Sequence, residues 1–535
     1  MSLFEGNMKN KSILEKWIID LGIIINPQVK IKETEDKGIG VFYNFDCNFN
    51  SNGEPIELIR IPQLSSYNIY TLKKLINDKL DDKDSKVIKR VLMIIFSKMN
   101  GNSESLILIS YFIGFLLICN KEKKLNDNNN INNNNNDDNN NKWKDEIKVY
   151  LNILLNTNVG NLYLDQQDIL QDFLSYFQGN AIIQNSIIDI TSGIWVDITE
   201  SINEEFSENF KIIKIEEVLQ ICSAIRSRVL EIPREIYNKE GDDDDYYVDV
   251  TLVPILDYVN HDNLLKNAYF DIDRETKDII LFYERKSSIN KEFEVEVFIS
   301  YDIFEDLHSM FINYGFLPIS EDIIKVIEIP IIGYNKFFNK ISDFDITRRL
   351  YCIKQSPNVQ FKIKFDNKGE IKEMKLLLEG FYSFLVFKDD IDWNKFEEED
   401  EEEGGGYEEE IDFEKGFNRS LQIMDNLNED EINELQTNLF EYIIEFFKEF
   451  KNKSKIFKDL IEEYELNIGE NRNISKLIDM YDSMSKFMLE KVQFEDFIEC
   501  NIDDNELRGY LGNRMMPIYN FDATISGAEV GELKI

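Results

Sequence analysis

The stretch LVPILDYVNHDN, residues 252–263, decides how the rest of this chain is expected to fold. Its apolar residues end at the polar pair Asn260-His261. A second apolar run, VEVFISYD at residues 295–302, ends in polar residues in the same way, and NYGF follows at residues 313–316. Each piece has a purely structural interpretation, since an Asn-His pair can be a buried cap and a strand-end tyrosine is commonly half-buried. The order of the pieces carries more information than any single one.

Two further segments precede this stretch. The segment GIGVF, residues 38–42, places two glycines in a strand pattern, which is typical of backbone that closely approaches another group or of a glycine-rich hairpin. The segment IRSRVL, residues 225–230, ends a helical pattern that begins at Glu216. Arg228 in this segment can simply interact with the helix C-terminus, where a cation is favoured.

The periodicity of apolar residues predicts a mixture of helices and strands. Helices are expected at Ser12–Leu21 (with Ile13, Trp17, Ile18 and Leu21 on one side), through Tyr70–Lys214, and at Glu216–Leu230, Ile432–Phe450 and Ile474–Met488. Strands are expected at Ile56–Ile61, Asn267–Asp273, Asp278–Glu284 and Val295–Ile299, the second and third of these forming a hairpin. The apolar run Leu106–Cys119 is shorter than the roughly 20 residues that span a bilayer, so it is expected to be a buried helix.

The net charge restricts the class of partner. The chain has 535 residues, with 101 acidic against 60 basic side chains, and its formal charge is −41. Such a charge repels nucleic acid and anionic membranes, so neither is expected as a partner, whereas a basic protein is a natural complement. A chain of this length is also expected to form more than one domain.

Cysteine and histidine usage restricts the chemistry. The five cysteines are scattered and the chain has only two histidines, so neither a disulfide framework nor a structural zinc site is expected. The N-terminal residues lack a secretory signal pattern. We therefore expect an intracellular protein, cytoplasmic or nuclear.

The order GIGVF, IRSRVL, LVPILDYVNH, VFISYD and NYGF resembles the SET-domain methyltransferases. More narrowly, it is similar to the Rubisco large-subunit methyltransferase-like branch, whose members methylate protein lysines. The resemblance implies an α+β fold with short twisted sheets and a pseudoknot, in which Asn260-His261 passes beneath the segment from Tyr301 to Phe316. It also implies four regions: residues 1–69 as the N-terminal part of the SET region, 70–214 as a helical insertion with a disordered Asn-rich tract at 126–141, 215–320 as the SET core, and 321–535 as a helical substrate-binding lobe with an acidic insertion at 397–410.

The same resemblance implies S-adenosylmethionine as cofactor and assigns roles to individual residues. Lys37, Gly38 and Ile39 would lie against the cofactor, Arg228 would pair with its carboxylate, and Asp257, Asn260 and His261 would hold its amino-acid end and adenine. Tyr301 matches the catalytic tyrosine, which also contacts the cofactor. Leu230 and Tyr314 match residues that line the channel for the substrate lysine.

Three positions depart from the family pattern. Asp302 replaces the glycine after the catalytic tyrosine, Leu230 replaces a phenylalanine, and Lys37 stands where a polar or acidic residue is frequent. Two alternatives therefore stay open beside protein-lysine methylation. One is a protein-histidine methyltransferase, although the apolar Val229-Leu230 favours lysine. The other is a SET-fold protein that binds a partner without catalysis.

Overall fold

The computed structural model describes residues 3–5, 11–34, 38–44, 55–99, 103–128, 142–157, 194–207, 210–235, 246–284, 294–301, 307–314, 316–318, 325–330, 358–366, 370–377 and 472–493, with single positions and short runs between 428 and 459. The predictions made for Lys37, Asp302 and residues 397–410 fall outside this part of the chain, and so do residues 129–141 of the tract predicted to be disordered at 126–141. The first three residues of that tract, 126–128, are instead the end of a helix.

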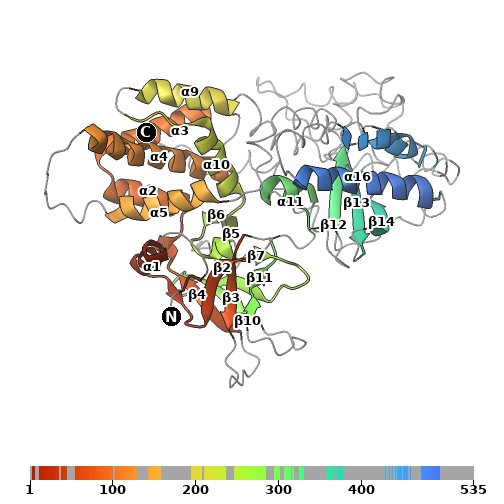
Figure 1. Ribbon diagram of the computed structural model, residues 1–535, viewed down its shortest axis with the longest axis horizontal. Helices are drawn as coiled ribbons and strands as arrows, with labels where there is room; N and C mark the ends of the chain where they lie inside the picture. The colour runs from red at the N-terminus through yellow and green to blue at the C-terminus, as the bar shows by residue number, and fades with distance from the viewer. Residues whose placement is uncertain are drawn as a thin grey trace, which may run out of the picture.

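The fold is α+β, with helices packed beside several small sheets (Figure 1). The first seven described helices are α1 (Lys11–Asp20), α2 (Ile69–Lys79), α3 (Asp82–Lys98), α4 (Glu104–Asn128), α5 (Lys142–Asn156), α9 (Ile194–Phe206) and α10 (Ile215–Arg226). Local sequence starts two of them. The Asn68 side chain forms a capping box with Thr71 before α2, and Asp81 accepts hydrogen bonds from two backbone amides at the start of α3.

Short strands form the sheets beneath these helices (Figure 1). A four-stranded sheet has the order β1 (Ile24–Ile25), β4 (Ile56–Ile61), β9 (Ile279–Tyr283) and β8 (Ala268–Ile272). A three-stranded sheet has the order β10 (Glu294–Glu296), β3 (Ile39–Asn44) and β2 (Val29–Glu33). The strands β5 (Val229–Glu235) and β6 (Tyr246–Leu252) pair antiparallel, and β7 (Asn260–His261) pairs parallel with β11 (Phe298–Ile299).

Several sequence predictions are confirmed here. The strand expected at Ile56–Ile61 is β4, and the expected hairpin is the antiparallel pair β8–β9. The apolar run Leu106–Cys119 lies inside α4, and nearly all of its side chains are buried. Among the described residues no helix is long and apolar enough to cross a membrane.

Three predictions about local structure are wrong. The strand expected at Val295–Ile299 is two strands, because the chain leaves β3 after β10 and then pairs with β7. The helix expected to reach Leu230 ends at Arg226, because Val229 and Leu230 pair with β6 across a sheet. Ile13, grouped by its helical spacing with Trp17 and Ile18, is 51% exposed, and Leu14 at the next position of α1 is the buried residue instead.

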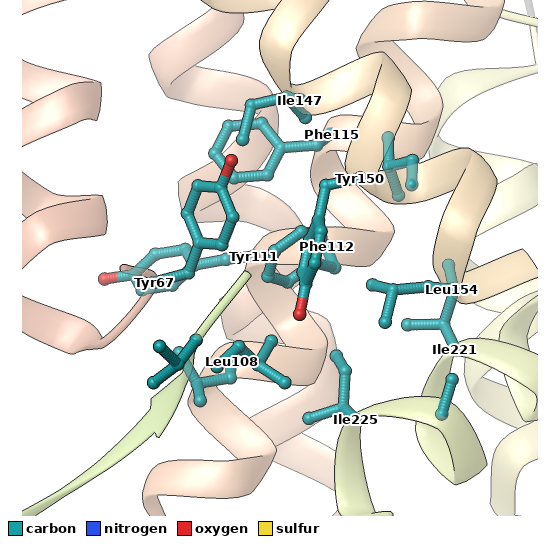
Figure 2. Packing of buried hydrophobic residues seen from close by; sticks show 14 of the residues in the cluster. Tyr67, Leu108, Tyr111, Phe112, Phe115, Ile147, Tyr150, Leu154, Ile221 and Ile225 are labelled. Carbon is teal, nitrogen blue, oxygen red and sulfur yellow. The ribbon is translucent and has the colours of Figure 1, made fainter. Parts of the chain in front are cut away.

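One hydrophobic core joins the helices to the sheets. It contains buried residues from α1 to α5, α9 and α10 together with residues of β2, β3, β4, β8 and β9. Figure 2 shows its aromatic centre, where side chains from α4 and α5 pack with Tyr67. The sheets and helices of this part therefore share one packed interior.

The C-terminal part contains a second group of elements. These are α11 (Leu307–Tyr314), β12 (Lys325–Pro330), β13 (Asn358–Phe365), β14 (Ile371–Leu377) and α16 (Arg472–Lys491). The strands form an antiparallel sheet, and α11 contacts both β12 and α10. Tyr481, Met484 and Met488 of α16 are buried, as their helical spacing predicts.

Candidate active site

The parallel pair of β7 and β11 brings the two polar-ended runs of the sequence together. Asn260 lies opposite Phe298, and His261 lies opposite Ile299. The Asn267 side chain hydrogen-bonds to the segment that leads from β10 into β11. Its amide nitrogen donates to the carbonyl of Glu296 over 2.8 Å, and its amide oxygen accepts from the N–H of Phe298 over 2.9 Å.

Tyr301 is held at both ends by the segment that contains His261. Its backbone N–H donates a hydrogen bond to His261 Nδ1 over 2.9 Å, and its hydroxyl donates to the carbonyl of Val259 over 2.7 Å. Burial raises the pKa of the Tyr301 phenol, and the neighbouring Tyr314 raises it further. The hydroxyl is therefore a neutral hydrogen-bond donor with a fixed direction.

Tyr301 belongs to a cluster of four aromatic rings. The ring centroid of Tyr301 lies 4.8 Å from that of Tyr314 and 5.1 Å from that of His261. Phe316 completes the group, 6.1 Å from His261 and 6.2 Å from Tyr314. Tyr314 comes from the end of α11, so a helix of the chain's second half forms one wall. Such a cluster excludes water and suits a cationic or methylated side chain.

The glycine segment approaches the same site through Asn260. The Asn260 amide nitrogen donates to Glu296 Oε1 over 2.8 Å and to the carbonyl of Ile39 over 3.3 Å. A carboxylate and a carbonyl can only accept, so this arrangement fixes the amide with Oδ1 turned away from both. A Cβ added at Gly40 would lie 2.7 Å from Glu296 Oε1 and 3.1 Å from Asn260 Nδ2. Gly40 is therefore needed for the close approach.

Arg228 and Asp257 form an ion pair beside the aromatic cluster. Arg228 Nε lies 3.7 Å from Asp257 Oδ2, and the aspartate side chain is 1% exposed. Burial raises the pKa of Asp257, while the charge of Arg228 and a hydrogen bond from Tyr150 oppose that rise. Both members of the pair also affect the pKa of the Tyr301 phenol, so they lie within electrostatic reach of it. Arg228 Nε is buried and lacks a hydrogen-bond acceptor among the described residues.

Most of the residues that the sequence singled out therefore lie together. Contacts connect Ile39, Asn260, His261, Tyr301 and Tyr314 in one chain of neighbours. Gly38, at a backbone φ of +76°, directly precedes Ile39. Leu230 lies on β5 opposite Thr251 and packs half-buried against the main core.

Sequence reasoning assigned no role to three residues of this site. Glu296 anchors Asn260, Phe316 faces His261, and Tyr150 reaches Asp257 from α5. Phe316 was part of the NYGF segment and could have been found there. No local sequence pattern marks Glu296 or Tyr150 as a site residue, since the first resembles any strand residue and the second any helix residue.

Comparison with known proteins identifies related sequences. The family model described as cytochrome c lysine N-methyltransferase 1 matches residues 13–372, well over half of the chain. The chain is 31% identical over 287 residues to cytochrome c lysine N-methyltransferase 1 of Saccharomyces cerevisiae, covering 51% of this chain and 42% of that protein. It is 31% identical over 297 residues to the protein of the same name from Kluyveromyces lactis, covering 54% and 53%.

The chain thus spans about half the length of the curated relatives that it matches. The matched range 13–372 includes the glycine segment, the Arg228–Asp257 pair and the aromatic cluster around Tyr301. This chain belongs to the family of cytochrome c lysine N-methyltransferases.

Proposed function

We propose that this protein is an S-adenosylmethionine-dependent protein-lysine N-methyltransferase with Tyr301 as its catalytic residue. The observation that carries the proposal is the double attachment of Tyr301, whose N–H donates to His261 and whose hydroxyl donates to Val259. Membership of the cytochrome c lysine N-methyltransferase family supports the reaction class. We further propose that the fold is a SET domain of the Rubisco methyltransferase-like branch. The parallel contact of β7 with β11 supports the expected pseudoknot.

The residues present fit the amino-acid end of S-adenosylmethionine. That end carries a carboxylate and an ammonium, which need a donor and an acceptor respectively. Arg228 offers a buried Nε that lacks an acceptor among the described residues. Asn260 offers Oδ1, because both hydrogens of its amide are used by Glu296 and Ile39. The two side chains therefore have the complementary character that this group requires.

The cofactor supplies an electrophilic methyl group, and the chain's residues align and desolvate its acceptor. The aromatic rings of Tyr301, Tyr314 and Phe316 exclude water from the entering lysine amine. Loss of water favours the neutral amine, whose lone pair is the nucleophile. The fixed Tyr301 oxygen would orient the entering amine by accepting a hydrogen bond from it. With the cofactor bound, the amine lone pair would take up the methyl group as its bond to sulfur is lost, and the methylated ammonium would release one proton to solvent.

A lysine of a basic protein is the proposed substrate, and cytochrome c is the first candidate because the relatives' name contains it. The formal charge of −41 favours a basic partner electrostatically. Raising the salt concentration should then raise KM more than it lowers kcat. We place the protein in the cytoplasm or nucleus, consistent with its scattered cysteines.

The test is transfer of a labelled methyl group to purified cytochrome c and, separately, to a purified histone, followed by mass spectrometry of the modified residues. Methyl-lysine with the wild type and a large loss with Tyr301→Phe would support the proposal. Methyl-histidine without methyl-lysine would instead establish histidine methylation. Calorimetry with S-adenosylmethionine separates an enzyme from a partner-binding protein. Absence of cofactor binding would favour the partner-binding protein. Cofactor binding, together with methyl transfer that Tyr301→Phe abolishes, would favour the enzyme.

A further inference from the structure

We propose that Tyr150, on helix α5 of the first helical group, is a positioning residue for the methyl-transfer site. It acts by holding the carboxylate of Asp257 and, through that carboxylate, Arg228. The inference rests on the proposed function for its catalytic consequence, but the contact itself does not. No resemblance in the sequence pointed to α5 as part of the site.

The contact between Tyr150 and Asp257 is direct and buried. The Tyr150 hydroxyl donates a hydrogen bond to Asp257 Oδ2 over 3.0 Å. The same oxygen lies 3.7 Å from Arg228 Nε. Oδ2 therefore receives a neutral donor from α5 and faces a cation from the start of β5. A buried carboxylate needs such partners, because an unpaired one is expensive to desolvate.

The ring of Tyr150 is fixed by aromatic neighbours from three other segments. Trp17 of α1 stacks on it at 5.9 Å between centroids, Tyr67 lies at 4.8 Å, and Phe112 of α4 lies at 5.8 Å. Figure 2 shows Tyr67, Phe112 and Tyr150 side by side in this core. With two rotatable bonds and a closely packed ring, the hydroxyl has little freedom to leave the carboxylate.

Asp257 is well placed to transmit this constraint to the reacting residues. It lies in the 3₁₀ turn Leu256–Tyr258, and this turn is followed directly by Val259. The carbonyl of Val259 accepts the hydrogen bond from the Tyr301 hydroxyl. Asn260 follows at the next position. Displacement of the turn would move the acceptor of Tyr301 and the strand that carries Asn260. Tyr150 thereby connects α5 to the site through one side-chain contact.

If Tyr150 holds Asp257, the pKa of Asp257 depends on the Tyr150 hydroxyl. The ionisable groups that influence or face it are Arg228, Tyr67, Tyr150, Tyr258 and Tyr301. Burial raises the pKa of Asp257, and Arg228 and the Tyr150 hydrogen bond lower it. Removing the Tyr150 hydroxyl takes away one of the interactions that lower the pKa of Asp257, so this pKa rises further. Once protonated, Asp257 no longer balances the charge of Arg228.

The chain offers a matched control in Tyr67. Its ring lies in the same cluster and its hydroxyl is also buried, close to the Trp17 indole, yet it makes no hydrogen bond of ordinary geometry with the described residues. Tyr150→Phe and Tyr67→Phe each remove one buried hydroxyl from adjacent rings. Only the first removes a donor from Asp257.

The first measurement is the pH profile of kcat/KM for methyl transfer by the full chain. For Tyr150→Phe we expect kcat/KM near neutral pH to fall about ten-fold, as for a lost hydrogen bond to a charged group. The acid limb should move to higher pH, so that activity partly recovers in alkaline buffer. Tyr67→Phe should leave the position of the limb unchanged. Equal losses at every pH for both variants, or no loss for Tyr150→Phe, would overturn the proposal.

The second measurement needs no turnover and separates this inference from the proposed function. The folded pKa of Asp257 is raised, so its ionisation lowers stability as pH rises from the unfolded value of about 3.9 through the folded value. In Tyr150→Phe the folded pKa of Asp257 is higher still, so stability continues to fall up to a higher pH. The difference in Tm between wild type and Tyr150→Phe should therefore widen as pH rises, whereas the difference for Tyr67→Phe should stay constant. A constant difference for both variants would refute the role of Tyr150 even in an active enzyme. A widening difference in a protein that transfers no methyl group would support the contact and refute only the proposed function.

Discussion

The backbone N–H of Tyr301 donates a hydrogen bond to Nδ1 of His261, and this contact fixes the tautomer of the imidazole. A nitrogen that accepts cannot carry the proton, so the hydrogen of the neutral ring is assigned to Nε2. His261 therefore serves as an acceptor that sets the position of Tyr301.

Replacing His261 with phenylalanine tests this role. His261→Phe keeps an aromatic ring against Tyr301 and Phe316 but leaves the Tyr301 N–H without its acceptor. An unsatisfied buried donor costs about 1–3 kcal/mol, so we expect a loss of that order in the free energy of unfolding, measured with urea. Methyl transfer should fall at the same time. Phe316→Leu, which removes a ring without touching this hydrogen bond, should be less destabilising. A His261→Phe protein as stable as the wild type would contradict the assignment.

The Tyr301 hydroxyl is expected to matter for turnover more than for binding. Tyr301→Phe should lower kcat by about 100-fold, the order of loss that misplacement of a reacting group causes, because it removes the oxygen that orients the amine. The Kd for S-adenosylmethionine, measured by calorimetry, should change only a few-fold, because the ring and the backbone N–H remain. Tyr269→Phe on the outer strand β8, where the ring stacks on Phe282, provides the control. Equal effects on kcat and on cofactor affinity would argue against a catalytic role.

Burial raises the pKa of the Tyr301 phenol, which predicts how kcat depends on pH in alkaline buffer. The hydroxyl stays protonated above the ordinary tyrosine pKa of about 10, so its ionisation should cause no loss of kcat below that pH. Initial rates between pH 7 and pH 10 measure this, with the stability of the protein checked at each pH. A tyrosine-like loss of activity centred near pH 9 that disappears in Tyr301→Phe would show that the phenol titrates earlier than this environment allows.

Two glycines of the segment GIGVF should respond differently to alanine. A methyl group at Gly40 meets the Glu296 carboxylate, which can move and release Asn260. We expect Gly40→Ala to fold but to bind S-adenosylmethionine at least ten-fold more weakly, in proportion to the lost charged hydrogen bond of about 1.5–3 kcal/mol. Gly38 has open space around it but a φ of +76°. Gly38→Ala should therefore cost about 1 kcal/mol of stability through its backbone. Calorimetry and urea unfolding of both variants decide whether the two effects separate.

An ion pair at the β8–β9 turn predicts a change of stability in acid. Asp273 accepts a hydrogen bond from Arg60 Nη1 over 2.8 Å, and with the backbone amides of Thr276 and Glu275 this lowers its pKa to about 2. The contribution is present above the unfolded pKa of about 3.9 and is lost as pH falls through about 2. Asp273→Asn should lower Tm at neutral pH by an amount that shrinks as pH falls below about 4. Asp271→Asn, at an exposed position of β8, is the control, and a Tm difference independent of pH would contradict the ion pair.

The sequence predicted those features that depend on neighbouring residues. The alternating runs near residues 270 and 280 specify the β8–β9 hairpin, because the two strands are joined by a short turn. The grouping of Asn260, His261 and Tyr301 came from the order of short motifs, and the structure places them in contact. Each of these follows from a pattern within a few residues or from a resemblance in motif order.

Features that depend on distant partners could not be predicted in this way. Nothing in the run Val295–Ile299 indicates that its first half pairs with β3 and its second half with β7. An alternating pattern specifies which face is buried but not which strand lies beside it. Tyr150 lies 107 residues from Asp257, and one tyrosine on an amphipathic helix resembles any other.

The contact of Asn260 with Ile39 has a consequence for the way this protein reaches its native state. These residues are 221 positions apart, so a very long loop must close before the amide can reach its carbonyl partner. Contacts of this kind form slowly compared with helices, whose bonds connect near neighbours. The helices can thus be complete while the proposed cofactor site is still absent. Circular dichroism would report early, helical folding, whereas gain of cofactor affinity during refolding would report the last step.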